Sequence, residues 1–210
     1  MHQALNETLP LIGGAFEPDE LAFLAATSKV ELPIRDRLAW ALHCALDERF
    51  TVSREWRRAD LAVLASDSVI SQLEAKALYA FNVLQPANRQ AYLNRLIADA
   101  AKMAALAASD RFLLSIIVDV RGDIRPELAA AVKYSSGISA GIKSSGDTVR
   151  SAAHDLWQDE LTGTFRSATV ELQIEAGRLW GLDVSVDLFL TGPLTGEAPG
   201  TGVADGLRGH

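Results

Sequence analysis

The chain is poor in cysteine: Cys44 is the single one among 210 residues. One thiol excludes a disulfide within the chain and any zinc site built from several cysteines. We therefore expect a reducing, cytoplasmic setting. We also expect no cofactor. No metal is expected, because the acidic residues lack the alternating Asp/Asn spacing of a calcium loop.

Positive charge and long apolar runs are scarce as well. The chain has 20 basic and 27 acidic side chains, a formal net charge of −7. Nucleic acids and anionic membrane surfaces both require a concentrated positive field, so neither is an expected partner. The longest apolar run, Phe112 to Val118, is interrupted by Ser115 and is too short to cross a bilayer as a helix. The N-terminus lacks the basic region of a signal peptide.

Strict alternation of apolar and polar residues is the strongest pattern present. It runs from Val170 to Ala176 and resumes from Leu182 to Leu188. Two such runs predict half-buried, antiparallel strands joined in a hairpin. The apolar face needs a cover, which helices upstream could supply, whereas the acidic face is expected to be solvated. That acidic face consists of Glu171, Glu175, Asp183 and Asp187.

Helical spacing dominates the first half of the chain. Five helices with short connections are expected between residues 16 and 108, which predicts a helical bundle. The third helix is predicted to begin near Ser53, the fourth at Asp67 or Ser68, and the fifth at Pro86. Residues 1–15 are expected to be a loose leader.

The pattern changes after residue 108. Arg111 to Val120 is apolar on both faces, as is typical of a central strand covered on both sides. A short helix from Pro126 to about Tyr134 is followed by a Ser/Gly-rich connection over 135–146, for which a short strand at Ile138–Ile142 or a helix stays open. A second helix then starts at Asp147. Residues 109–191 are thus expected to form a small α+β region, and residues 192–210 a disordered tail. The predicted fold class is α+β: an N-terminal helical bundle, then a small sheet (central strand plus C-terminal antiparallel hairpin) with two helices.

The one catalytic-looking string is Gly137-Ile138-Ser139-Ala140-Gly141, which fits G-x-S-x-G. In serine hydrolases this spacing lets a tight strand-to-helix turn project a nucleophilic serine. His154 and Asp147 would be the base and the acid, but all three residues lie within one short stretch. A strand is not predicted before the serine, so a flexible connection is the favoured interpretation.

These observations favour a non-enzymatic cytosolic interaction or regulatory module that binds a protein partner or itself. Candidate contact residues are those of the hairpin loop, Arg178, Leu179 and Trp180. The alternative is a serine hydrolase that uses Ser139. A weaker alternative is a membrane-active protein that acts through the Gly/Ser-rich segment 130–145.

The hairpin register is also predictable, because residues that face inward must lie opposite one another. Pairing Ala176 with Trp180 leaves a three-residue loop and sets Ile174 opposite Leu182. A register with a wider loop would place Glu175 directly opposite Asp183, and like charges in that position are destabilising. The tighter register is therefore expected.

Overall fold

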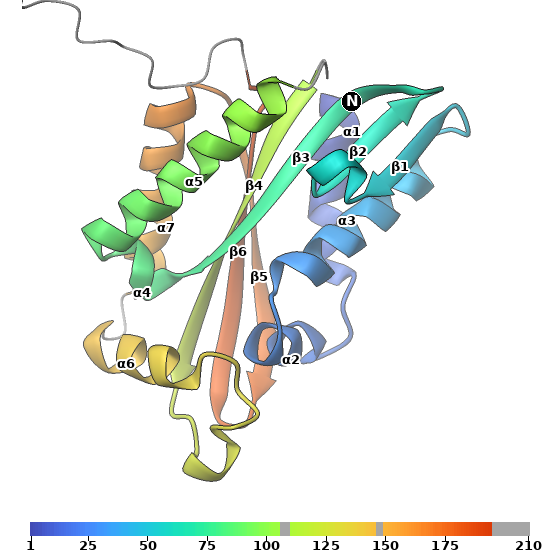
Figure 1. Cartoon of the computed structure of the whole chain (residues 1–210). Helices are drawn as coiled ribbons and strands as arrows, with labels where there is room; N and C mark the ends of the chain where they lie inside the picture. Colours follow the sequence, from blue (N-terminus) through green and yellow to red (C-terminus); the bar gives the residue numbers. More distant parts are fainter. Residues whose placement is uncertain (106–109, 146–148, 195–210) are drawn as a thin grey trace, which may run out of the picture.

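The structure, a computed structural model, describes residues 1–105, 110–145 and 149–194. One six-stranded sheet forms its centre, in the order β1-β2-β3-β4-β6-β5 (Figure 1). β3 and β4 are parallel, and every other neighbouring pair is antiparallel. The α+β class predicted from the sequence is confirmed. The strands are β1 (Phe50–Arg54), β2 (Leu61–Ala65), β3 (Ser68–Tyr79), β4 (Asp110–Gly122), β5 (Thr169–Leu179) and β6 (Leu182–Thr191).

Helices cover both faces of this sheet (Figure 1). The N-terminal helices α1 (His2–Thr8), η1 (Leu9–Gly14), α2 (Glu20–Thr27) and α3 (Glu31–Ala45) share one hydrophobic core with the sheet. On the other face, α4 (Ala80–Val83), α5 (Pro86–Ala104) and α7 (Val149–Phe165) share a second core. α6 (Ser135–Ser145) lies across one end of the sheet, and η2 (Trp56–Arg58) and η3 (Pro126–Leu128) are short turns in connections. None of the helices in the described ranges combines the length and the apolar character that a membrane span requires.

β4 is the central strand, as its two-sided apolar pattern predicts. Leu114 and Ile116 belong to the core beneath the N-terminal helices. Leu113 and Ile117 belong to the core beneath α5 and α7. Alternate residues of a strand point to opposite faces, so a strand buried on both sides reads as a continuous apolar run.

The N-terminal residues differ from the expected loose leader. Leu5, Leu9 and Ile12 are at most 1% exposed and pack in the core with α2 and α3. Their spacing of four and three residues places them on one side of a helix, which outweighs the helix-breaking tendency of Pro10 and of Gly13 with Gly14.

The expected helical bundle over 16–108 is wrong in its middle third, because the segments near Ser53 and Ser68 form β1, β2 and β3. Residues four apart share a face in a strand as well as in a helix, so Leu73 and Ala77 fitted either element. The alternation from Gln72 to Ala77 is the feature that distinguishes them. The fifth expected helix is confirmed, because α5 begins at Pro86 as predicted.

The connection expected over 135–146 is instead the helix α6, from Ser135 to Ser145. The helix expected after Pro126 is limited to the single turn η3. Of the expected tail, Gly192 to Leu194 are described, and Leu194 packs against the core beneath α5 and α7. The remainder of that tail, 195–210, lies outside the described residues.

The hairpin register predicted from the sequence is wrong. Ile174 lies opposite Val186 rather than Leu182, and Glu175 lies opposite Ser185. The loop contains only Trp180 and Gly181, both with positive φ (54° and 89°), as a type I′ hairpin turn requires. A bulge between Glu175 and Gly177 shifts the ladder by one residue, so the apolar faces still match and no two acids are opposed.

Candidate functional site

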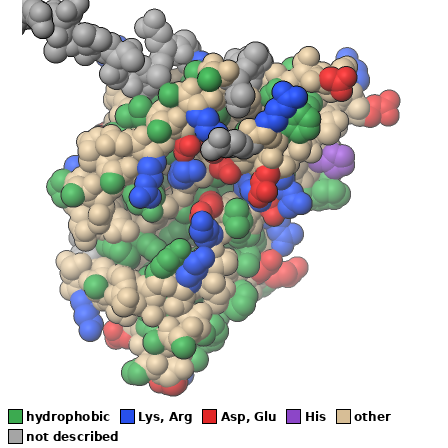
Figure 2. Space-filling view, in the orientation of Figure 1, with side chains coloured by type: hydrophobic (Ala, Val, Ile, Leu, Met, Phe, Trp, Pro, Cys, Tyr) green, Lys and Arg blue, Asp and Glu red, His purple; other side chains and the backbone are tan. Residues whose placement is uncertain are grey.

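A surface cavity of about 810 Å³ lies beside the second half of β3. Its walls come from β3, α5, α6 and the segment that joins α2 to α3. In the space-filling view, hydrophobic and basic side chains gather around a hollow between these elements (Figure 2). The volume falls within the range of sites that bind small molecules or peptide side chains, roughly 300–1,000 Å³.

The cavity exists because β2 is shorter than β3. β2 pairs with β3 only as far as Leu73, and the remaining residues of β3 pair with β4 alone. Just past the end of this pairing, the backbone N–H of Ala75 donates to Oδ2 of Asp60 at 2.8 Å. Beyond Ala75, the edge of β3 forms one wall of the cavity.

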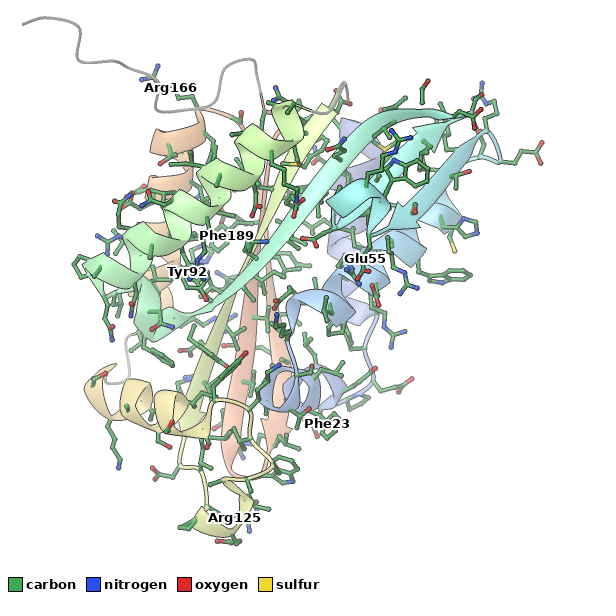
Figure 3. All side chains as sticks on the ribbon, in the orientation of Figure 1. Phe23, Glu55, Tyr92, Arg125, Arg166 and Phe189 are labelled. Carbon is green, nitrogen blue, oxygen red and sulfur yellow. The ribbon has the colours of Figure 1, made fainter. Side chains whose placement is uncertain are left out.

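Three tyrosines and one carboxylate line the cavity: Tyr79, Tyr92, Tyr134 and Glu31. Burial raises the pKa of Tyr79 to about 12, and its neighbours Tyr134, Tyr92 and Glu31 add to this effect. Burial also raises the pKa of Tyr92, which projects from α5 toward the sheet (Figure 3). The hydroxyls of Tyr79 and Tyr92 are therefore protonated at neutral pH and are available as hydrogen-bond donors.

Three cations also line the cavity. Lys29 and Arg95 are exposed and form no ion pair with a carboxylate in the described ranges. The guanidinium of Arg95 lies 5.1 Å from the centre of the Tyr92 ring. The third cation, Lys76, has its ammonium 3.1 Å from Oδ2 of Asp99. Burial lowers the pKa of Lys76, but Asp99 and the other nearby carboxylates more than offset this, so the net pKa is raised.

One of the two glycines of the G-x-S-x-G string serves helix packing. A Cβ at Gly141 would lie 2.5 Å from the Phe81 ring, so α6 approaches α4 closely only because this residue is glycine. Gly137 also lines the cavity, and a Cβ there would meet nothing within 4 Å. Ser139 lies between them on α6, in a helix rather than at a strand-to-helix turn, and it does not line the cavity.

His154 lies in a polar network between α7 and the sheet, not in the cavity. Its ring nitrogens are 3.2 Å from Oδ2 of Asp187 and 3.1 Å from Oε2 of Glu171. The Asp187 carboxylate is 1% exposed and also accepts from the guanidinium of Arg150 at 2.8 Å. Three of the four carboxylates expected to be solvated, Glu171, Glu175 and Asp187, thus pair with residues of α7, although Glu175 remains exposed.

This network does not form the catalytic set considered from the sequence. Within the described residues, no hydrogen bond joins Ser139 to His154 or to a carboxylate. Asp147, the proposed acid, lies outside the described residues. A search of the described side chains also finds no cluster of three or more His, Cys, Asp or Glu that could hold a metal ion.

The hairpin tip is held against α2. Oδ1 of Asp19 accepts from the backbone N–H of Arg178 at 2.7 Å, and the Arg178 side chain pairs with Asp183. The Trp180 ring meets the Phe23 ring edge to face, with 6.4 Å between their centres. Leu179, directly opposite Leu182, packs against the core of the N-terminal helices. Of the three candidate contact residues, Trp180 therefore belongs to an aromatic pair and Arg178 is engaged within the hairpin.

The cavity itself was missed from the sequence. Its tyrosines lie at positions 79, 92 and 134, on a strand, a helix and a connection, so no local spacing relates them. The signal that could have found it is the alternation in β3 together with the shortness of β2, which predicts an incompletely paired edge. Comparison of the chain with known protein families, with characterised proteins and with solved structures gave no match.

Proposed function

We propose that this chain is a non-enzymatic interaction module, and that the cavity beside β3 receives a segment of a protein partner. The observation that carries the proposal is the cavity itself: it joins apolar walls, tyrosine hydroxyls and two cations that pair with no carboxylate among the described residues. Binding sites commonly pair an apolar lining with a few polar groups that fix orientation. A reducing, cytoplasmic location is part of the same proposal and is supported by the single free Cys44.

A helix that borders the cavity offers a matched pair of variants. Ala140 lines the cavity, whereas Ser136 is exposed on the same helix, one turn away, and does not line it. Ala140→Trp would fill the cavity, and Ser136→Trp would add the same bulk outside it. Both positions are at the surface, so neither substitution removes a buried side chain.

The test is selection of seven-residue peptides from a displayed random library on the wild-type chain. We expect selected peptides to bind the Ser136→Trp variant as they bind wild type, and to lose about tenfold or more in affinity for Ala140→Trp. Failure to select any peptide, or equal binding to both variants, would contradict the proposal. Sedimentation measurements would show whether the partner is a second copy of the chain.

The hairpin tip is a second candidate surface for the same function. Phe23 is 47% exposed and forms the aromatic pair with Trp180, and exposed aromatic residues often anchor protein interfaces. Peptides that bind Ala140→Trp as tightly as wild type, but bind Phe23→Ser more weakly, would assign the interaction to this surface.

A further inference from the structure

The second half of β3 presents to the cavity a backbone edge with which no strand of the described residues pairs. In a β-ladder the N–H and C=O groups of alternate residues point to the same side. The N–H of Ala75 points away from β4, since it donates to Asp60. The backbone groups of Ala77 and the N–H of Tyr79 therefore point the same way, toward the cavity, where no described strand pairs with β3. The carbonyl of Tyr79, the N-cap of α4, is engaged by the first turn of that helix.

An edge of this kind is a template for another strand. Proteins usually protect exposed edges with a covering helix, a bulge or a proline. Here β3 carries no proline between Ser68 and Tyr79, and a cavity lies beside the edge instead of a covering element. Extended peptides are commonly recognised by addition to such an edge, where main-chain hydrogen bonds give affinity and alternating side chains give specificity.

The charges around the edge indicate which peptide it suits. Lys29 borders the cavity from the segment between α2 and α3, and Arg95 borders it from α5. Lys76 also lines the cavity, but its charge is paired with Asp99, so Lys29 and Arg95 supply the positive charge against the single lining carboxylate, Glu31. A strand placed on the edge would direct alternate side chains to opposite faces of the sheet. Acidic side chains on it would therefore meet a positively charged wall.

We propose that the ligand of this cavity is an acidic peptide in extended conformation, which adds as a strand to β3 between Ala75 and Tyr79. This inference rests on the proposed function and specifies its ligand and its binding mode. The open edge is about 13 Å long, at roughly 3.3 Å per residue, which matches a paired segment of about four residues. A peptide of six residues would cover it with one residue to spare at each end.

The test uses a defined probe, an acetylated and amidated hexapeptide of alternating glutamate and valine. Two further peptides carry methyl groups on alternate backbone nitrogens, one on the odd positions and the other on the even positions. Only one set of peptide N–H groups can face β3, because successive N–H groups of a strand alternate in direction. We expect one methylated peptide to lose affinity by about tenfold or more, and the other to bind as the parent does.

Three charge tests accompany this experiment. Arg95→Ser should weaken binding of the glutamate peptide about threefold to tenfold, through loss of a nearby positive charge. Arg125→Ser removes the same charge at an exposed position below α6 (Figure 3), outside the residues that line the cavity, and should leave affinity unchanged. A peptide with lysine in place of glutamate should bind more weakly than the parent.

Each outcome separates the inference from the proposed function. If the parent peptide binds and both methylated peptides bind equally well, strand addition is wrong although the cavity still binds peptides. If the lysine peptide binds as tightly as the parent, the assignment of acidic ligands is wrong. If the parent fails to bind at concentrations up to about 1 mM, the inference is wrong, and the library selection decides the proposed function independently.

Discussion

Glu74 should make the stability of this protein fall as the pH rises toward 7. Its carboxyl group is on β3, faces α5 and is only 2% exposed. The ammonium of Lys102 donates to one of its oxygens, and the ammonium of Lys76 lies 3.9 Å from the other. Burial nevertheless raises its pKa to about 7, against the opposing effect of Lys102 and with a further contribution from Asp60.

The direction and size of the effect follow from proton linkage. The pKa of Glu74 rises from 4.5 in its ordinary state to about 7 in the folded chain. Between these values the folded chain holds a proton that the unfolded chain has released, so the free energy of unfolding decreases with rising pH. The stabilisation that comes from protonated Glu74 is fully present below pH 4.5 and is lost as the pH rises through 7. The loss amounts to about 3 kcal/mol, or about 6–12 °C in melting temperature for a chain of this size.

Urea unfolding of wild type and Glu74→Gln between pH 5 and 8 would measure this contribution. Glutamine has nearly the same shape but does not titrate, so the variant should lose most of the pH dependence in this interval. Glu127→Gln, in the exposed turn η3, is the matched control and should retain the wild-type dependence. Equal pH dependence in wild type and Glu74→Gln would refute the reasoning.

A fluorophosphonate probe should not label the native protein, and stoichiometric labelling at Ser139 would instead support the hydrolase alternative. Asp187→Ala should lower the free energy of unfolding by about 3 kcal/mol, because it leaves the Arg150 charge half-buried without this partner; a loss below about 1 kcal/mol in chemical denaturation would contradict this. Gly177→Ala should destabilise the fold, since φ is 110° and its Cβ would lie 2.2 Å from Oδ1 of Asp19. Gly163→Ala, at an open position in α7, should be neutral or stabilising by up to about 1 kcal/mol, and equal melting temperatures for the two glycine variants would contradict both expectations.

The strands that were predicted correctly are those whose pattern fits only one structure. Alternation from Val170 to Ala176 has no helical equivalent, and the two-sided apolar run around Ile116 fits a strand buried on both faces. The pattern of β3 was ambiguous because Leu73 and Ala77 also have helical spacing. Local periodicity therefore found the centre and one edge of the sheet and missed the other edge.

The hairpin register could not be derived from charge repulsion alone. A two-residue I′ turn needs positive φ at both residues, and tryptophan is not a residue that favours it. The structure places Trp180 there, with its ring against Phe23. This tertiary contact and the bulge near Gly177 both depend on residues distant from the turn. The strand sequences alone do not contain that information.

The candidate cavity was beyond sequence reasoning for a similar reason. Its wall is the part of β3 that β2 leaves unpaired, so its position depends on the relative lengths of two strands. Its tyrosine and cation groups come from segments that meet only after the parallel crossover from β3 through α5 to β4 has formed. A crossover brings together residues that are far apart in sequence, so no local sequence motif predicts that they will meet.

The polar network beneath α7 depends on a match between the spacing of polar residues on α7 and on β5, which is present in the sequence. Arg150, His154 and Gln158 are spaced by four residues, which is about 6 Å along a helix. Their partners on β5 are Glu175, Gln173 and Glu171, spaced by two residues, which is about 6.7 Å along a strand. The two repeats nearly coincide when the helix and the strand run in opposite directions, so each of these three residues of α7 meets one of β5. Apolar contact is not directional, whereas hydrogen bonds are, and this ladder therefore fixes the position of α7 along the sheet.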